Sequence, residues 1–138
     1  MDNIVSKYVV ILIFLLGASI LSGCEDEIKE GNGRLEGIIS IGPICPVETD
    51  PPEPACLPTA ETYNAYPVYV WTANKSRKVA KIEPELDGSF FLELAAGDYI
   101  VDLDKEQIAL GGSNLPLGIS IEPLATASLS IEIDTGIR

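Results

Sequence analysis

The feature that most constrains this fold is a two-residue alternation of apolar and polar side chains, which recurs from Gly33 to the end of the chain. Successive side chains of a β-strand point to opposite faces, so this period predicts strands with one buried face and one wet face. Turn-forming residues separate seven such segments. Their apolar positions, strand by strand, are Leu35, Ile39 and Ile41; Val68, Val70 and Thr72; Val79 and Ile82; Phe90, Leu92 and Leu94; Tyr99, Val101 and Leu103; Leu117, Ile119 and Ile121; and Leu129, Ile131 and Ile133.

Strands of this length and spacing favour one architecture. We expect a single all-β domain over residues 34–138, a seven-stranded Greek-key-type sandwich whose sheets each have one wet face. The sequence predicts no helix beyond residue 23, no internal repeat and no second domain. One small core is what a chain of this size can build.

The N-terminal residues differ sharply from the alternating part. Residues 8–20 carry no charge and follow Lys7, and the next four residues are Leu21, Ser22, Gly23 and Cys24. A membrane-spanning helix needs roughly 20 apolar residues, so a run of this length suits the apolar core of a signal peptide.

The order leucine, two small residues, cysteine resembles the bacterial lipoprotein signal. This resemblance implies a signal helix over residues 1–23, cleavage between Gly23 and Cys24, and a lipid on the Cys24 sulfur that anchors the protein to the cell membrane or the outer membrane. Two alternatives stay open, a plain secretory signal and an uncleaved anchor over residues 5–23. More than one acyl chain makes such anchoring stable.

The charge of the chain fits a covalent anchor better than adsorption to lipid. The net charge is −12, and removal of residues 1–23 leaves it unchanged because only Asp2 and Lys7 are lost. Such a surface repels nucleic-acid phosphates and anionic lipid. After the cysteine, residues 25–33 have almost nothing to bury and contain two glycines, so we expect residues 24–33 to be the lipidated cysteine and a flexible tether.

Two cysteines remain for the exported domain, Cys45 and Cys56. In an oxidising compartment an even pair normally forms a disulfide, which predicts a bond that staples the proline-rich acidic stretch between them. The competing interpretation is a pair of metal-ligating thiolates. It lacks further ligands, because the chain has no histidine and no other free cysteine. We expect no metal and no cofactor.

Residues 87–101 resemble the carboxypeptidase regulatory-like group of prealbumin-like (transthyretin-type) sandwiches. Asp87-Gly88-Ser89-Phe90 matches its D-G-x-F turn, and Leu94 to Val101 matches its L-x-x-G-x-Y-x-V pattern. The resemblance implies that the Tyr99 ring packs in the core while its hydroxyl reaches a backbone group. The chain is also similar to small exported bacterial proteins of uncharacterised function, which share I-G-P-x-C-P-V (residues 41–47) and I-D-T-G-I-R (residues 133–138).

The sequence offers few parts for catalysis. Without histidine there is no imidazole base and no Ser–His or Cys–His pair, and the carboxylates fall on the polar faces of strands. We expect a non-enzymatic protein. The densest acidic cluster, formed by Asp98, Asp102, Asp104 and Glu106, allows a calcium interpretation but lacks EF-hand-like spacing, so a solvated sheet edge is preferred.

The remaining candidate binding residues are aromatic: Tyr63, Tyr66, Tyr69 and Trp71. Exposed aromatic rings stack on sugars or anchor a partner, whereas buried ones fill a core. Two functions follow as hypotheses. The first is a membrane-anchored, non-catalytic module of the cell envelope that binds another protein or has a structural role. The second is a small-ligand or carbohydrate-binding module, which requires Tyr69 and Trp71 to lie exposed side by side.

Overall fold

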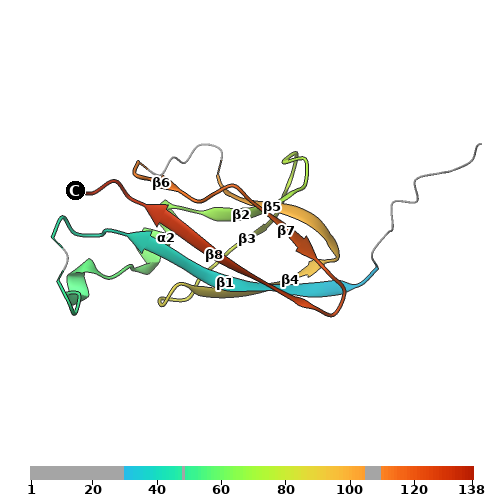
Figure 1. The fold of residues 1–138 in the computed structure, drawn as a ribbon, viewed down its shortest axis with the longest axis horizontal. Helices are drawn as coiled ribbons and strands as arrows, with labels where there is room; N and C mark the ends of the chain where they lie inside the picture. Colours follow the sequence, from blue (N-terminus) through green and yellow to red (C-terminus); the bar gives the residue numbers. More distant parts are fainter. Residues whose placement is uncertain (1–29, 48, 105–109) are drawn as a thin grey trace, which may run out of the picture.

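The computed structural model describes residues 30–47, 49–104 and 110–138, and over these ranges it is a two-layered β-sandwich (Figure 1). Each layer is a four-stranded sheet of the described residues. In chain order the elements are β1 (Asn32–Gly42), η1 (Pro54–Cys56), α2 (Ala60–Ala65), β2 (Val68–Thr72), β3 (Lys78–Lys81), β4 (Ser89–Ala95), β5 (Gly97–Leu103), β6 (Gly112–Ser113), β7 (Leu117–Ile121) and β8 (Thr126–Asp134).

The first and last strands lie side by side at the centre of one sheet, whose order is β4-β1-β8-β6. β1 and β8 run parallel, with Ile39 opposite Ile131, whereas β4 pairs with β1 antiparallel. The other sheet has the order β3-β2-β5-β7 and is antiparallel throughout. Each sheet therefore leaves two strands at its edges.

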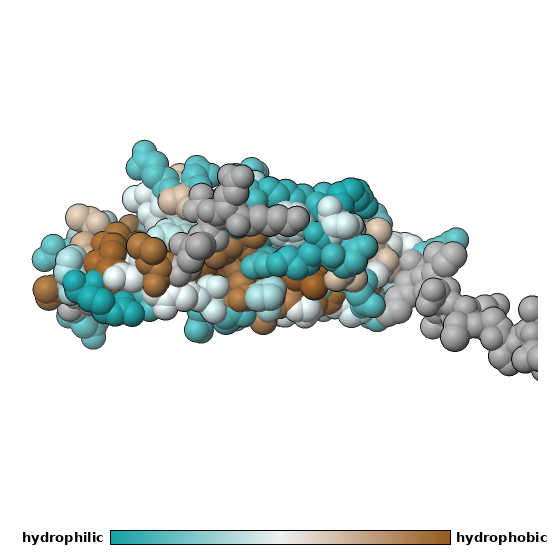
Figure 2. Space-filling model, turned by 90° about the horizontal axis from the view of Figure 1, so that it is seen from above, coloured by the Kyte–Doolittle hydropathy of each residue, from teal (hydrophilic) through white to brown (hydrophobic). Residues whose placement is uncertain are grey.

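The predicted apolar faces meet between the sheets. Leu35, Val70, Val101, Ile121 and Ile131 are fully buried there. Figure 2 shows the same layering as a band of hydrophobic side chains with hydrophilic residues on either side of it. The prediction of an all-β sandwich built on period-two alternation is confirmed.

The structure adds three elements that the alternation does not predict, which are η1, α2 and β6, and the expectation of no helix beyond residue 23 is therefore wrong. β6 is a two-residue strand that pairs with β8, and glycine-rich residues 111–114 give it no apolar pattern. α2 is held by its N-terminal cap: the Thr59 hydroxyl accepts a bond from the Thr62 N–H, and the Thr62 hydroxyl accepts one from the Thr59 N–H. Six residues are too few to show a helical period.

The start of the domain also differs from expectation. β1 begins at Asn32, where Asn32 and Gly33 pair with Ala95 and Leu94, so the last two residues of the expected tether belong to the sheet. The signal segment, Gly23, Cys24 and the tether up to residue 29 lie outside the described residues. None of the helices in the described part of the chain is long and apolar enough to cross a membrane.

Candidate functional site

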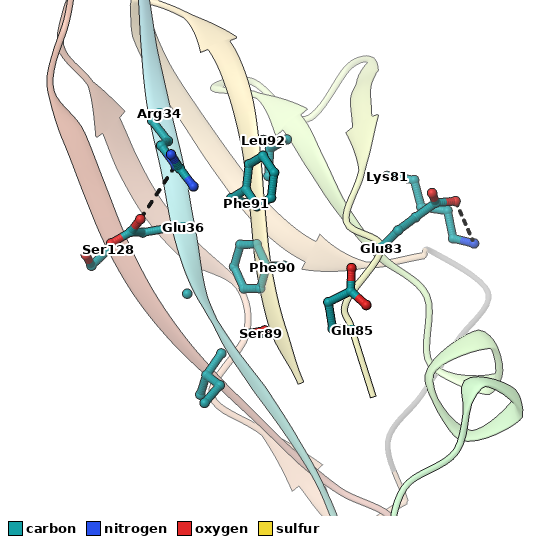
Figure 3. A pocket seen from close by; sticks show the side chains of 12 residues that line it. Arg34, Glu36, Lys81, Glu83, Glu85, Ser89, Phe90, Phe91, Leu92 and Ser128 are labelled. Carbon is teal, nitrogen blue, oxygen red and sulfur yellow. Dashed lines mark ion pairs between the residues drawn. The ribbon is translucent and has the colours of Figure 1, made fainter. Parts of the chain in front are cut away.

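A groove of about 740 Å³ runs along β4 and is here called the β4 groove. Its floor is the outer surface of β1 and β4, and its opposite wall is the segment 81–85 that leads from β3 towards β4 (Figure 3). The side chains that give it its character are Arg34, Glu36, Ile38, Glu83, Glu85 and Phe91.

Two large apolar side chains lie open on the floor of the β4 groove. Phe91 is 67% exposed and Ile38 is 46% exposed. Phe91 is exposed because Phe90 takes the core-facing position of β4, and Ile38 is exposed because Ile39 takes that position on β1. The Arg34 guanidinium lies 4.4 Å from the centroid of the Phe91 ring, a cation–π contact, and pairs with Glu36 at 3.6 Å. The floor is thus an apolar patch with a charged rim.

The opposite wall is acidic. Lys81 pairs weakly with Glu83 at 3.9 Å, and the Glu83 side chain is 80% exposed. Glu85 is held in place through its backbone, because its N–H donates to the Ser89 carbonyl at 2.8 Å. Figure 3 shows Glu83 and Glu85 projecting from this segment across from β4.

The turn that closes one end of the groove depends on Gly88. Its φ is +83°, and a Cβ at this position would lie 2.2 Å from the Ile39 carbonyl oxygen. The Asp87 carboxylate accepts bonds from the Ser89 hydroxyl at 2.6 Å and from the Ser89 N–H at 2.9 Å. These bonds hold the pKa of Asp87 below its ordinary value, and the bond from the Ser89 hydroxyl has the largest effect. Burial, and secondarily Asp87, raises the pKa of the Tyr63 hydroxyl.

The aromatic platform considered from the sequence does not form. Trp71 is 3% exposed and Tyr63 is 8% exposed, while Tyr66 and Tyr69 are half-buried. Tyr63 packs into the core from α2, and the Trp71 and Tyr69 rings meet edge to face at 6.2 Å. The expectation of a binding surface formed by Tyr63, Tyr66, Tyr69 and Trp71 is therefore corrected for Tyr63 and Trp71, whose rings are buried, and stays a prediction for Tyr66 and Tyr69.

The two cysteines of the domain are joined: Cys45 and Cys56 form a disulfide with their Cα atoms 5.4 Å apart. It closes the proline-rich stretch on itself, and η1 lies at its second cysteine. Among the described residues of the range 43–66, Tyr63 is the one buried hydrophobic side chain.

The acidic cluster is divided among ion pairs where the structure describes it. Asp102 pairs with Lys75, and Asp104 pairs with Lys78 at 2.6 Å. Glu106 lies outside the described residues. No group of three or more potential metal ligands comes together in the described ranges. Asp102 and Asp104 are therefore carboxylates neutralised by lysines, whereas Asp98 is exposed on β5 with no ion pair among the described residues.

The two short motifs at residues 41–47 and 133–138 meet at one junction. Thr135, buried at 6% exposure, donates from its hydroxyl to the Pro43 carbonyl at 2.5 Å and from its N–H to the Gly42 carbonyl at 3.1 Å. Arg138 then folds back on Asp134 at 2.7 Å. The parallel pairing of β1 with β8 makes this meeting possible, and it fastens the start of the disulfide-bonded stretch to the sheet.

The residues of the β4 groove were missed from the sequence. The available signal was the pair Phe90-Phe91, which puts a large aromatic side chain on the wet face of a strand. Which outward residues are then covered depends on the path of residues 82–88, and alternation does not predict that path.

No protein-family profile and no curated protein sequence matches the chain. Solved structures do resemble it. A DUF3823 family protein from Parabacteroides merdae is 13% identical with a TM-score of 0.45, over 75% of this chain and 46% of that one. GBS52, the minor pilin of Streptococcus agalactiae, is 15% identical with a TM-score of 0.47, over 76% of this chain and 45% of that one. The chain thus spans less than half the length of each of these structures.

Proposed function

We propose that this protein is a lipid-anchored, non-catalytic module of the cell envelope that binds another protein through the β4 groove. The observation that carries the proposal is the groove floor itself. Phe91 and Ile38 are both exposed at diagonal positions of the β4–β1 pair, and charged residues surround them. Exposed aromatic side chains in a polar rim are characteristic of protein-binding surfaces, whereas a small-molecule site encloses its ligand.

The anchor part of the proposal rests on the sequence. Leu21-Ser22-Gly23-Cys24 after an uncharged run supports lipidation of Cys24, and the Cys45–Cys56 disulfide accords with an oxidising compartment. The absence of histidine from the sequence, which removes an imidazole acid or base, supports the non-catalytic part of the proposal. The carbohydrate-binding alternative loses its main support, because Trp71 is buried.

The anchor is tested by growing cells with a fatty-acid analogue. We expect the wild type to be labelled and membrane-bound, and the Cys24→Ser variant to be unlabelled and released or mislocalised. Equal labelling of the two proteins would sink the lipoprotein proposal.

The binding face is tested by placing a photo-reactive residue at Phe91 in cells that make the protein naturally. The matched control is Leu124, a 99% exposed apolar residue in the turn between β7 and β8. We expect one discrete protein adduct from position 91 and none from position 124. Identical adduct patterns from both positions contradict a binding role for the groove.

A further inference from the structure

We infer that β4 accepts an extra strand at its open edge, and that the occupant is an extended segment of another protein with alternating lysine or arginine and apolar residues. This inference rests on the proposed function and names the class of its partner. The docking mode is β-augmentation, in which main-chain hydrogen bonds hold an added strand and side-chain contacts select it.

β4 differs from the other edge strands that the structure describes. It is seven residues long, with the sequence SFFLELA. β3 is four residues and begins and ends with lysine, β6 is two residues, and β7 contains a glycine and follows Pro116. Short length, lysine and proline are the ordinary devices that protect an edge from pairing. β4 has none of them, and Glu93 is its sole charge.

The hydrogen bonds of β4 define an open window. Residues of an antiparallel edge strand alternate between facing the neighbouring strand and facing outward. Gly88 and Ala96 bond to the β1 chain, so Ser89, Phe91, Glu93 and Ala95 turn their backbone groups to the open edge. Ser89 is satisfied by Glu85 and Asp87, and the Ala95 carbonyl accepts from the Tyr99 hydroxyl at 2.8 Å. Within the described residues, the N–H and carbonyl groups of Phe91 and Glu93 remain without a hydrogen-bond partner.

The open window is too short to pair with a long added strand. Both of its ends are capped, by the Asp87-Gly88 turn and by Tyr99, so an added strand finds two adjacent outward residues with open donors and acceptors. That sets the paired part of the partner at about five residues, given the alternation of bonded positions. Phe91 supplies a neighbouring apolar contact for every second partner side chain.

The acidic side chains near the open edge of β4 favour a positively charged added strand. Arg34 pairs with Glu36 and Lys81 with Glu83, but Glu85 and Glu93 have no ion pair among the described residues. Glu85 lies at the groove wall and Glu93 lies on β4 within the open window, and the whole chain carries a net charge of −12. A second copy of this chain would bring Glu93 against an equally acidic edge, so like charges oppose self-pairing.

Hydrogen exchange on the full mature chain in detergent tests the inference. The probe is a short blocked peptide that alternates lysine and valine, used up to about 1 mM. We expect it to slow exchange of the Phe91 and Glu93 amides by about tenfold, while the already bonded Leu92 amide changes little. A peptide with the same lysines but a central proline, and a peptide alternating glutamate and valine, should give no protection.

Two variants separate backbone pairing from charge. Glu93→Pro removes an outward N–H and leaves the β1 ladder intact, so it should abolish protection of Phe91. Glu93→Ala keeps the N–H and should only weaken binding. If Glu93→Pro fails to fold by circular dichroism, the three peptides on the wild type still decide the question.

Each remaining outcome has one meaning. Absence of protection at both amides overturns strand addition, and equal protection by the glutamate–valine peptide overturns the cationic partner. If protection rises with protein concentration in the absence of peptide, the occupant is a second copy of this chain, and the proposal of a cationic partner is overturned. If the Phe91 cross-link persists without peptide protection, strand addition alone fails. Loss of the cross-link contradicts the proposed function.

Discussion

The strand framework and the stretch of residues 43–66 between β1 and β2 are stabilised in different ways. In the framework, alternation alone brings fully buried side chains such as Leu35, Val101 and Ile131 into one core. The stretch contributes one buried hydrophobic side chain among its described residues, Tyr63, and is otherwise held by the disulfide, the Thr59–Thr62 cap and the Thr135 bonds to Gly42 and Pro43. Burial of apolar side chains therefore specifies the sandwich, whereas a few individual bonds specify the conformation of residues 43–66 at one end of it.

The sharpest test of that contrast is truncation in the framework. Leu35 is fully buried on β1, and Leu35→Ala should lower the free energy of unfolding by about 4 kcal/mol through lost burial and a new cavity. Urea denaturation measures the change. Val47→Ala is the control in the stretch, where a 75% exposed side chain should leave stability nearly unchanged. Equal effects at the two positions would break the comparison.

Loss of the disulfide should come next. The Cys45→Ala, Cys56→Ala double variant should lower stability by about 2–3 kcal/mol, because the open loop gains freedom in the unfolded chain. Hydrogen exchange should show the strand amides still protected and the stretch more open. If the sheet amides lose protection together with the stretch, the two regions are one cooperative unit and the contrast is wrong.

Most of the framework was predictable from the sequence because its long strands repeat one signal, whereas the two-residue β6 has no apolar pattern. The apolar positions from Leu35 to Ile133 follow the two-residue period except at β3, where Val79 and Ile82 are three residues apart, and the family resemblance pointed to the Tyr99 bond. The end of the sandwich was not predictable, since α2 depends on one cap and the Thr135 junction joins positions far apart in the chain. The β4 groove was not predicted for a similar reason, because its shape depends on the path of residues 82–88 opposite Phe91. The aromatic side chains that the sequence offered as binding residues are instead largely packed.

Tyr99 gives a finer test inside the framework. Its ring is half-buried against the core, less than the sequence predicted, and its hydroxyl donates to the Ala95 carbonyl as the resemblance implied. Tyr99→Phe should lower stability by about 1 kcal/mol by removing that bond. Tyr99→Ala should cost more, about 2–3 kcal/mol, since the ring contacts are lost as well. Thermal and urea denaturation compare the two variants, and equal losses would mean that the hydroxyl alone matters.

The smallest effect belongs to the contact between the two regions, where Tyr63 of the stretch lies beside the Asp87-Gly88 turn of the framework. Burial and Asp87 raise the pKa of the Tyr63 hydroxyl in the folded state. A raised folded pKa means that the neutral phenol is favoured by folding, so this contribution is fully present below the unfolded pKa of about 10 and is lost as pH rises through the folded value. The protein should therefore lose stability on the alkaline side in a way that Tyr63→Phe does not share.

Urea denaturation at a series of alkaline pH values tests this, with the difference between wild type and Tyr63→Phe as the measured quantity. That difference should change in favour of the variant as pH rises above about 10, because phenylalanine cannot ionise. Asp87→Asn is the control for the cause, and it should reduce the alkaline loss only in part, since burial is the larger of the two effects on the pKa. A loss that disappears entirely in Asp87→Asn would show that charge, and not packing of Tyr63 under the turn, joins the fastened end to the sandwich.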